Sequence, residues 1–184
     1  MIKVKTNNSQ HRIEQGDILS NVEFYEKVEL IKGDIEVSII NFPFVYVLTQ
    51  DCDLEWDHSF RSDTQRNDDK LLLSVLVVPL YIKEHVISGE HLQDIDRVAT
   101  RFNINQSSTK LIFQNNNPRY HYLEFLPEIP LNNSIIDFKH YFSIAPNILE
   151  SQKQSSFICK VESVYREDIS QRFAAFLSRI GLPA

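Results

Sequence analysis

The sequence predicts an α+β domain built on a strongly curved, mostly antiparallel sheet or barrel, with two or three peripheral helices. Three observations predict this class. Short apolar runs alternate with polar residues and are bounded by Gly, Pro and Asn turn signals. One long amphipathic helix stands near the C-terminus. Twelve Phe and seven Tyr against four Gly indicate a well-packed, strand-rich interior, and 184 residues match the size of one domain.

Two Gly-Asp turn signals, at residues 15–17 and 32–34, introduce the first strands. The segment 18–25 follows the first turn and has alternating apolar residues. After the second turn, apolar and polar residues alternate over 35–40, which predicts a half-buried strand.

The next segment is the most apolar strand candidate of the chain. Residues 41–43 (Asn-Phe-Pro) are expected to break the preceding strand, and 44–48 reads as a central strand buried on both faces. The polar stretch 54–69 predicts a long exposed connection that borders the site, because long loops inside compact domains are often functional. A further strong strand spans 71–80.

The second half adds helices and shorter strands. The apolar spacing over 82–104 predicts a helix, and the stripe over 165–180 predicts a second helix that ends at Gly181. Short strands are expected at 110–113, 119–125, 135–138, 141–144 and 157–161. We interpret the chain as a single domain, 1–184, with a barrel-like core at about 15–80 and an elaboration over 81–184.

Composition narrows the classes of function. The formal charge of −6 argues against broad non-specific nucleic-acid binding, although a local basic groove is compatible with it. Two cysteines far apart do not make a disulfide framework. The polar N-terminus and the lack of a long apolar run favour a cytoplasmic protein without a membrane span. No Gly-rich phosphate loop or His-Glu-x-x-His motif occurs, so no cofactor is expected.

The densest polar cluster, Thr49-Gln50-Asp51-Cys52-Asp53, directly follows the central strand. If the strand continued, Asp51 and Asp53 would share one side and could hold a divalent metal or share protons. Equally, such Asp residues cap turns and helices. Cys52 is either a nucleophile or a small buried residue, and a zinc site with Cys159 matches no standard spacing.

A second candidate site lies at Arg119-Tyr120-His121-Tyr122. On a strand Arg119 and His121 share a face, where Arg could hold a phosphodiester and His could move a proton. The tyrosines would face the other way and stack bases or simply pack. The alternative is a half-exposed strand of large amphipathic residues.

The segment Asp137-Phe138-Lys139-His140 is the third candidate. Asp137 and Lys139 would share a face and form an ion pair, and His140 is expected to be structural.

The order of segments resembles a known family. Gly16-Asp17-Ile18 opens a first strand, Val45-Tyr46-Val47-Leu48-Thr49 follows, and a further strand ends at Val77-Val78-Pro79-Leu80. Over residues 15–80 this is similar to the PemK/MazF-like growth-inhibiting toxins, which are small SH3-like barrels. The resemblance implies metal-independent RNA cleavage by a homodimer with an antitoxin partner. Thr49 matches the family's active-site Ser/Thr, but residues 20–34 lack the family's catalytic Arg.

Three functions are therefore weighed. The first is a barrel-based RNA-binding or RNA-cleaving protein of bacterial toxin or defence type, with Thr49, Arg119 and His121 as catalytic residues. Its substrate-binding residues would be Asp51, Asp53, Tyr120, Tyr122 and Lys139. The second is a non-enzymatic protein–protein interaction module in a bacterial operon, with an apolar patch around Phe173, Phe176 and the strand tyrosines. The third is a metal-dependent hydrolase that uses Asp51 and Asp53 with a third ligand from Asp137, His121 or His140.

Overall fold

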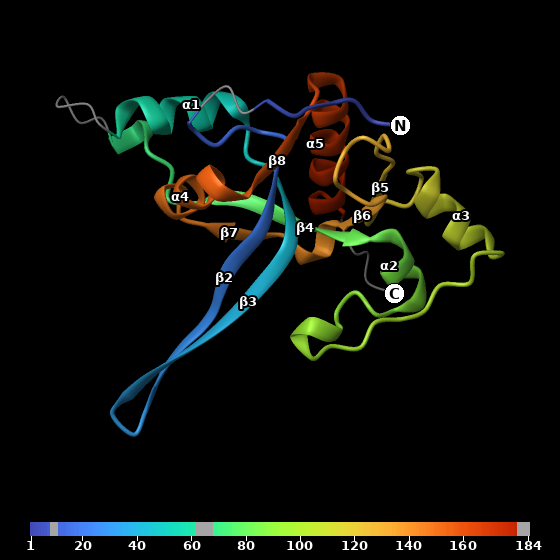
Figure 1. The fold of residues 1–184 in the computed structure, drawn as a ribbon, viewed down its shortest axis with the longest axis horizontal. Helices are drawn as coiled ribbons and strands as arrows, with labels where there is room; N and C mark the ends of the chain where they lie inside the picture. The colour runs from blue at the N-terminus through green and yellow to red at the C-terminus, as the bar shows by residue number, and fades with distance from the viewer. Residues whose placement is uncertain (8–10, 62–67, 180–184) are drawn as a thin grey trace.

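The computed structural model describes residues 1–7, 11–61 and 68–179, and its centre is one curled sheet (Figure 1). The strand order is β1-β8-β2-β3-β4-β6-β5, β7 also pairs with β4, and every pairing is antiparallel. The strands are β1 (Val4–Lys5), β2 (Asp17–Ile31), β3 (Asp34–Val47), β4 (Val75–Ile82), β5 (Tyr120–Leu123), β6 (Ser134–Asp137), β7 (Phe142–Ile144) and β8 (Phe157–Val161). The α+β class with a curved antiparallel sheet is confirmed.

Helices cover both faces of the sheet. The described residues form five α-helices, against the two or three expected: α1 (Asp51–Phe60), α2 (Lys83–Ser88), α3 (Ser107–Phe113), α4 (Pro146–Ser156) and α5 (Ser163–Leu177). On one face α5 contributes Ile169, Phe173 and Phe176 to a core with Tyr46 and Phe138. On the other face α1 and α4 pack through Leu54 and Leu149 onto β2, β3 and β4. None of the described helices is long and apolar enough to cross a membrane.

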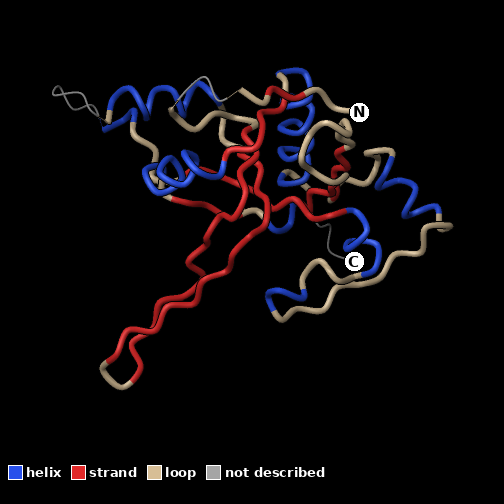
Figure 2. The backbone as a smooth tube through the Cα atoms, in the orientation of Figure 1, coloured by secondary structure: helices blue, strands red, loops and turns tan. Residues whose placement is uncertain are grey.

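Strands β2 and β3 form one long hairpin that leaves the body of the molecule (Figure 2). Its turn residues Lys32 and Gly33 both have positive φ, 55° and 97°. This is the backbone of a two-residue type I′ turn, whose twist matches that of the flanking strands. The local turn chemistry therefore closes the hairpin where the sequence predicted a turn.

The predicted strand break at 41–43 is wrong, because β3 runs through it. Pro43 has no N–H to donate, but the residue between the paired positions Ser20 and Val22 is Asn21, which has a φ of 52°. A proline is tolerated where the ladder is locally irregular, so the strand continues through it.

Three other predicted segments are corrected. Most of the described part of the expected loop 54–69 is helix α1, while residues 62–67 lie outside the described residues. The expected helix 82–104 is only the short α2, the 3₁₀ turn Gln93–Ile95 and loops, and the strand expected at 110–113 lies in α3. Helix α4 was not predicted. Its mean apolar content is low, and its helical character depends on Pro146 at the first turn and on burial of Leu149.

Candidate functional site

The polar cluster after β3 begins a helix instead of extending the strand. Strand β3 ends at Val47 and Asp51 is the first residue of α1, so the two aspartates occupy its first turn. Carboxylates there are stabilised by the positive end of the helix dipole, but the N-cap of α1 is Gln50 and no side chain caps this helix, so neither aspartate has the expected capping role. Thr49 accepts a hydrogen bond from the backbone N–H of Leu76 at 2.7 Å and so links the end of β3 to β4.

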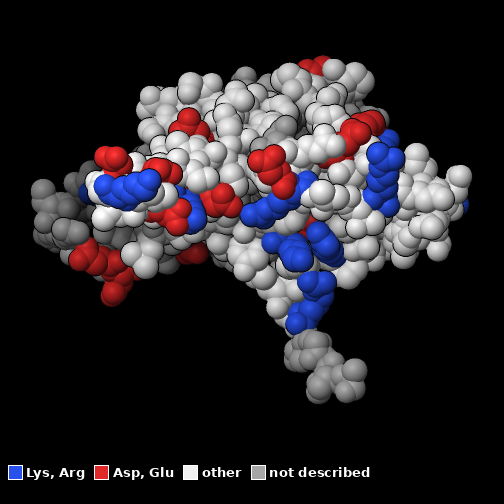
Figure 3. All heavy atoms as spheres, turned by 90° about the horizontal axis from the view of Figure 1, so that it is seen from below, with Lys and Arg blue, Asp and Glu red and all other residues white. Residues whose placement is uncertain are grey.

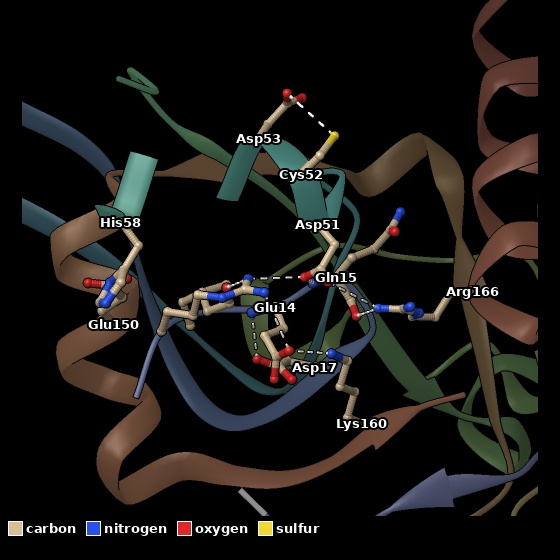
Figure 4. A network of polar contacts seen from close by, with 12 residues as sticks. Glu14, Gln15, Asp17, Asp51, Cys52, Asp53, His58, Glu150, Lys160 and Arg166 are labelled. Carbon is tan, nitrogen blue, oxygen red and sulfur yellow. Dashed lines mark hydrogen bonds and ion pairs between the residues drawn. The ribbon is translucent and has the colours of Figure 1, made fainter. Parts of the chain in front are cut away.

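Asp51 is held by groups from distant parts of the chain (Figure 4). Its Oδ1 accepts from Arg12 at 3.1 Å and from the backbone N–H of Gln15 at 3.2 Å, and Arg166 of α5 lies 3.9 Å from Oδ2. Burial alone would raise the pKa of Asp51, but the Arg12 hydrogen bond and nearby positive charges of Lys160 and Arg12 lower it overall. The carboxylate is therefore ionised and already paired with positively charged side chains of the protein itself.

Beneath Asp51 lies a second pair of charges. Lys153 of α4 and Asp17 of β2 are 1% and 0% exposed, and Lys153 Nζ lies 2.7 Å from Asp17 Oδ2. Lys153 also donates to the backbone carbonyl of Arg12 at 2.6 Å, and Lys160 of β8 pairs with Glu14 at 2.5 Å. These contacts fix the segment 12–17 against α4 and β8. We interpret this network as structural, because each carboxylate in it is matched by a cation of the protein.

Gly16 allows this segment to approach α5 closely. Its φ is +87°, and a Cβ there would lie 2.4 Å from the Cδ of Arg166. Only glycine fits both the backbone conformation and the contact.

Cys52 and Asp53 point away from this network (Figure 4). Cys52 is an exposed free thiol at hydrogen-bond distance from Gln50 (3.8 Å) and Asp53 (3.7 Å). A hollow of about 360 Å³ beside it is lined by Gln15, Gln50, Asp51, Cys52, Glu167, Ser170 and Gln171. This lining includes no histidine, lysine or arginine, so it supplies no imidazole or cation to activate the thiol. Cys159, by contrast, is buried, and burial raises the pKa of its thiol to about 12.

The metal-site alternative finds no third ligand. Across the residues that the structure describes, no group of three or more His, Cys, Asp or Glu side chains is placed to hold a metal ion. Asp51 is instead held by Arg12 and the Gln15 backbone, while Asp53 lies beside Cys52.

Arg119 is bound to Asp137 rather than free for a substrate. It lies in the turn before β5, donates from Nε to Asp137 Oδ1 at 2.8 Å, and its guanidinium lies 4.9 Å from the ring centroid of Tyr120. Asp137 is 1% exposed and also accepts from the backbone N–H of Lys139 at 3.0 Å, whereas the Lys139 side chain is exposed. The expected Asp137–Lys139 ion pair is thus replaced by a pair with Arg119.

We expect Arg119→Ala to lower the free energy of unfolding by about 2 kcal/mol, since it leaves a buried carboxylate without its main partner. Urea denaturation measures this loss. Lys139→Ala, which removes an exposed neighbouring cation, should change stability by less than about 0.5 kcal/mol. Equal stabilities of the two variants would contradict the structural role of Arg119.

His121 lies on the opposite face of β5 from Tyr120. It is 3% exposed, packs near Phe138, and its Nδ1 has no hydrogen-bond partner. Burial, with a smaller contribution from the charge of Arg172, lowers the pKa of His121 to about 3. Arg119 precedes β5, and its side chain lies on the Tyr120 face, against Asp137. Arg119 and His121 therefore lie on opposite faces of β5 and not on one face as expected.

The remaining predicted residues pack separately. Tyr120 makes an edge-on contact with Phe102, and Tyr122 makes one with Phe113, so both tyrosines serve the core beside α3. The described contacts of Thr49 include neither Arg119 nor His121; its hydroxyl binds the backbone of β4. The structure therefore does not assemble the predicted catalytic group.

The structure does bring together a cluster that sequence reasoning missed. The hydroxyl of Tyr81 lies 3.0 Å from His140 Nδ1, and His140 lies 3.6 Å from Asp137. The ring of Tyr81 also contacts His91 at 4.9 Å, beside a cavity of about 120 Å³. Burial lowers the pKa of both histidines. Asp137 and His140 come from the third predicted segment, but no local pattern connects that segment to Tyr81 or His91, which come from two other segments.

The most unusual surface is on the outer hairpin, residues 25–39, which we call the arm. The register pairs Tyr25 with Ile39, Val28 with Val37 and Leu30 with Ile35, and it shifts between Tyr25 and Lys27. Ile35, Val37 and Ile39 are alternate residues of one strand and so share a face. The extra residue in β2, Glu26, puts their three partners on that same face. We call these six residues the apolar face of the arm.

All six side chains of the apolar face are exposed, from 46% for Val37 to 74% for Leu30. The opposite face, which we call the charged face, carries the cross-strand pairs Lys27–Ser38 and Glu29–Glu36. Closer to the body, Phe24 and Ile40 lie on the same side of the hairpin as the charged face. Phe142 packs against them in the core that also contains Leu54 and Leu149, but this cover ends before the arm. The alternation over 35–40 was the sequence signal for this face, although it predicted burial.

A scan against protein-family models, a search of curated proteins and a search of solved structures each returned no match.

Proposed function

We propose that this protein is a non-enzymatic protein–protein interaction module that binds through the apolar face of the arm. One observation carries the proposal: six large apolar side chains lie on one face of a two-stranded ribbon that projects from the body. Their exposed fractions correspond to roughly 600 Å² of apolar surface, at the upper end of the patches found on monomers, and patches of this kind are often binding sites.

The arm also has the architecture of a docking element. An isolated two-stranded hairpin is only marginally stable in water, and an amphipathic ribbon is stabilised when its apolar side is covered. The charged face, with the Lys27–Glu29 ion pair at 2.7 Å, keeps the other side compatible with solvent. The patch first expected around Phe173 and Phe176 is not available, since both side chains are only 8% exposed.

RNA cleavage receives less support from the geometry. The buried His121, whose pKa is about 3, is neither accessible nor poised to move a proton near neutral pH. The face drawn in Figure 3 mixes both signs of charge: a group of Lys and Arg side chains near its middle has Asp and Glu on either side. A continuous basic groove for a phosphodiester backbone is not seen on that face.

Affinity capture with matched variants tests the proposal. Leu30→Lys/Ile35→Glu replaces one cross-strand apolar pair by an ion pair, which preserves the hairpin while it removes apolar surface. Glu29→Thr/Glu36→Thr alters the neighbouring pair on the charged face. We expect the wild type and the charged-face variant to retain a bound protein, identified by mass spectrometry, that the apolar-face variant loses at least about tenfold. Equal capture by all three proteins would contradict the proposal.

A further inference from the structure

We infer that the apolar face of the arm binds a second copy of this chain, so that two arms pack face to face as a four-stranded, two-layer sandwich. This inference rests on the proposed function and names its partner. Two amphipathic ribbons with identical apolar faces bury both when they stack about 10 Å apart, which is the usual packing of two sheets.

The order of side chains along the arm is compatible with two-fold symmetry. Val28 and Val37 form the middle pair, between Tyr25–Ile39 toward the body and Leu30–Ile35 toward the tip. We place a two-fold axis between the two apolar faces, at the level of the valines and perpendicular to the strands. This axis sets the Leu30–Ile35 pair of one copy against the Tyr25–Ile39 pair of the other. Such an arrangement is isologous, so each patch is its own complement. It also keeps the two bodies at opposite ends of the paired arms, where they do not collide.

The area agrees with a weak but specific dimer. Roughly 600 Å² from each copy gives about 1,200 Å² in total, which is the lower bound for specific interfaces. The contribution is largest near the tip, where Leu30 is 74% and Ile35 72% exposed. We therefore expect a dissociation constant in the micromolar range rather than an obligate dimer.

The charges of the arm are placed where they do not oppose this stacking. Glu29 and Glu36 are paired across the strands on the charged face, and Lys27 binds Glu29 there. In the sandwich both charged faces point outward into water. Because the two arms carry the same charges, salt should screen the residual repulsion between copies and leave dimerisation unchanged or slightly stronger.

Sedimentation velocity over a concentration series, together with chemical cross-linking of engineered thiols, tests the inference. In a Cys52→Ser background, which removes the exposed native thiol, Val28→Cys is expected to give a covalent dimer with a short thiol-specific bifunctional cross-linker, because the two Val28 positions face each other at the axis across stacked sheets about 10 Å apart, a spacing too wide for a direct disulfide. Glu29→Cys in the same background is the matched control on the charged face and should remain monomeric. Leu30→Lys/Ile35→Glu should weaken the uncross-linked dimer at least about tenfold, with an unchanged circular dichroism spectrum.

The outcomes separate this inference from the proposed function. A concentration-dependent dimer that the apolar-face variant loses supports both. A wild type that stays monomeric at all concentrations, while the arm still captures a different protein, overturns the second copy as partner and leaves the proposed function standing. A monomer with no arm-dependent capture overturns both. Equal cross-linking of the Val28→Cys and Glu29→Cys proteins would overturn the face-to-face arrangement.

Discussion

Replacing Lys153 by methionine is expected to lower the free energy of unfolding by about 3–5 kcal/mol, the range for breaking a buried ion pair by removal of one partner. Methionine keeps most of the volume of the side chain, so packing changes little. Asp17, which is 0% exposed, would lose the cation at 2.7 Å, and the backbone carbonyl of Arg12 would lose its donor. Asp17 would keep the hydrogen bond from the backbone N–H of Glu14 at 2.9 Å, so the cost is that of a buried carboxylate without its counter-ion.

Urea denaturation of three further proteins isolates the cause. Asp17→Asn/Lys153→Met, which removes both charges, should recover part of the lost stability. Lys27→Met makes the same substitution in the Lys27–Glu29 pair, where both side chains are exposed, and should cost less than about 1 kcal/mol. If Lys153→Met costs no more than Lys27→Met, the network around Asp17 does not stabilise the fold as described.

Replacing His121 by leucine is expected to reduce the loss of unfolding free energy that the protein shows at acidic pH. In the unfolded chain the imidazole has a pKa of about 6.5, and in the folded protein burial lowers the pKa of His121 to about 3. Between these values the unfolded state binds a proton that the folded state does not. This difference lowers the unfolding free energy of the wild type by up to about 1.4 kcal/mol for each unit that the pH falls below about 6.5.

At pH 7 both states of the histidine are neutral, so the substitution should matter little there. At about pH 4.5 the leucine variant should be more stable than the wild type by about 2–3 kcal/mol. His91 and His140, whose pKa values burial also lowers, contribute their own acid destabilisation, so the variant loses only part of the slope. His121→Gln is the control for packing: an equal loss of slope in both variants identifies the proton, and unchanged slopes in both would refute it.

Sequence patterns anticipated those elements whose determinants are local. The apolar stripe and end signals predicted α5 within a few residues, the segment 157–161 is β8, and the Lys32-Gly33 turn closes the hairpin as expected. Helices α1 and α4 escaped prediction because much of their stability comes from burying Leu54 and Leu149 against the sheet. Tertiary packing of this kind outweighs intrinsic propensity.

The candidate sites divide in the same way. The sequence by itself determined that Asp51 stands just after a central strand, and the alternative of a helix start was among its interpretations. Only the tertiary structure decided that Arg12 and the backbone N–H of Gln15 donate hydrogen bonds to the Asp51 carboxylate, because these partners lie more than thirty residues away along the chain. Likewise, the face on which Arg119 lies depended on where β5 begins.

The arm illustrates the division most clearly. The alternation of Ile35, Val37 and Ile39 determined that one face of this strand is apolar, since successive side chains of a strand point to opposite sides. Whether that face is buried depends on what lies over it. Strand β4 pairs with β3 only at Val45–Val47, so among the described residues no further strand lies beside the arm. The cover from Phe142 ends at Phe24 and Ile40, which lie at the body-side end of the hairpin on the side of the charged face. The exposure of the arm is thus a property of the assembled sheet, because the coverage of a face depends on contacts between segments distant in sequence.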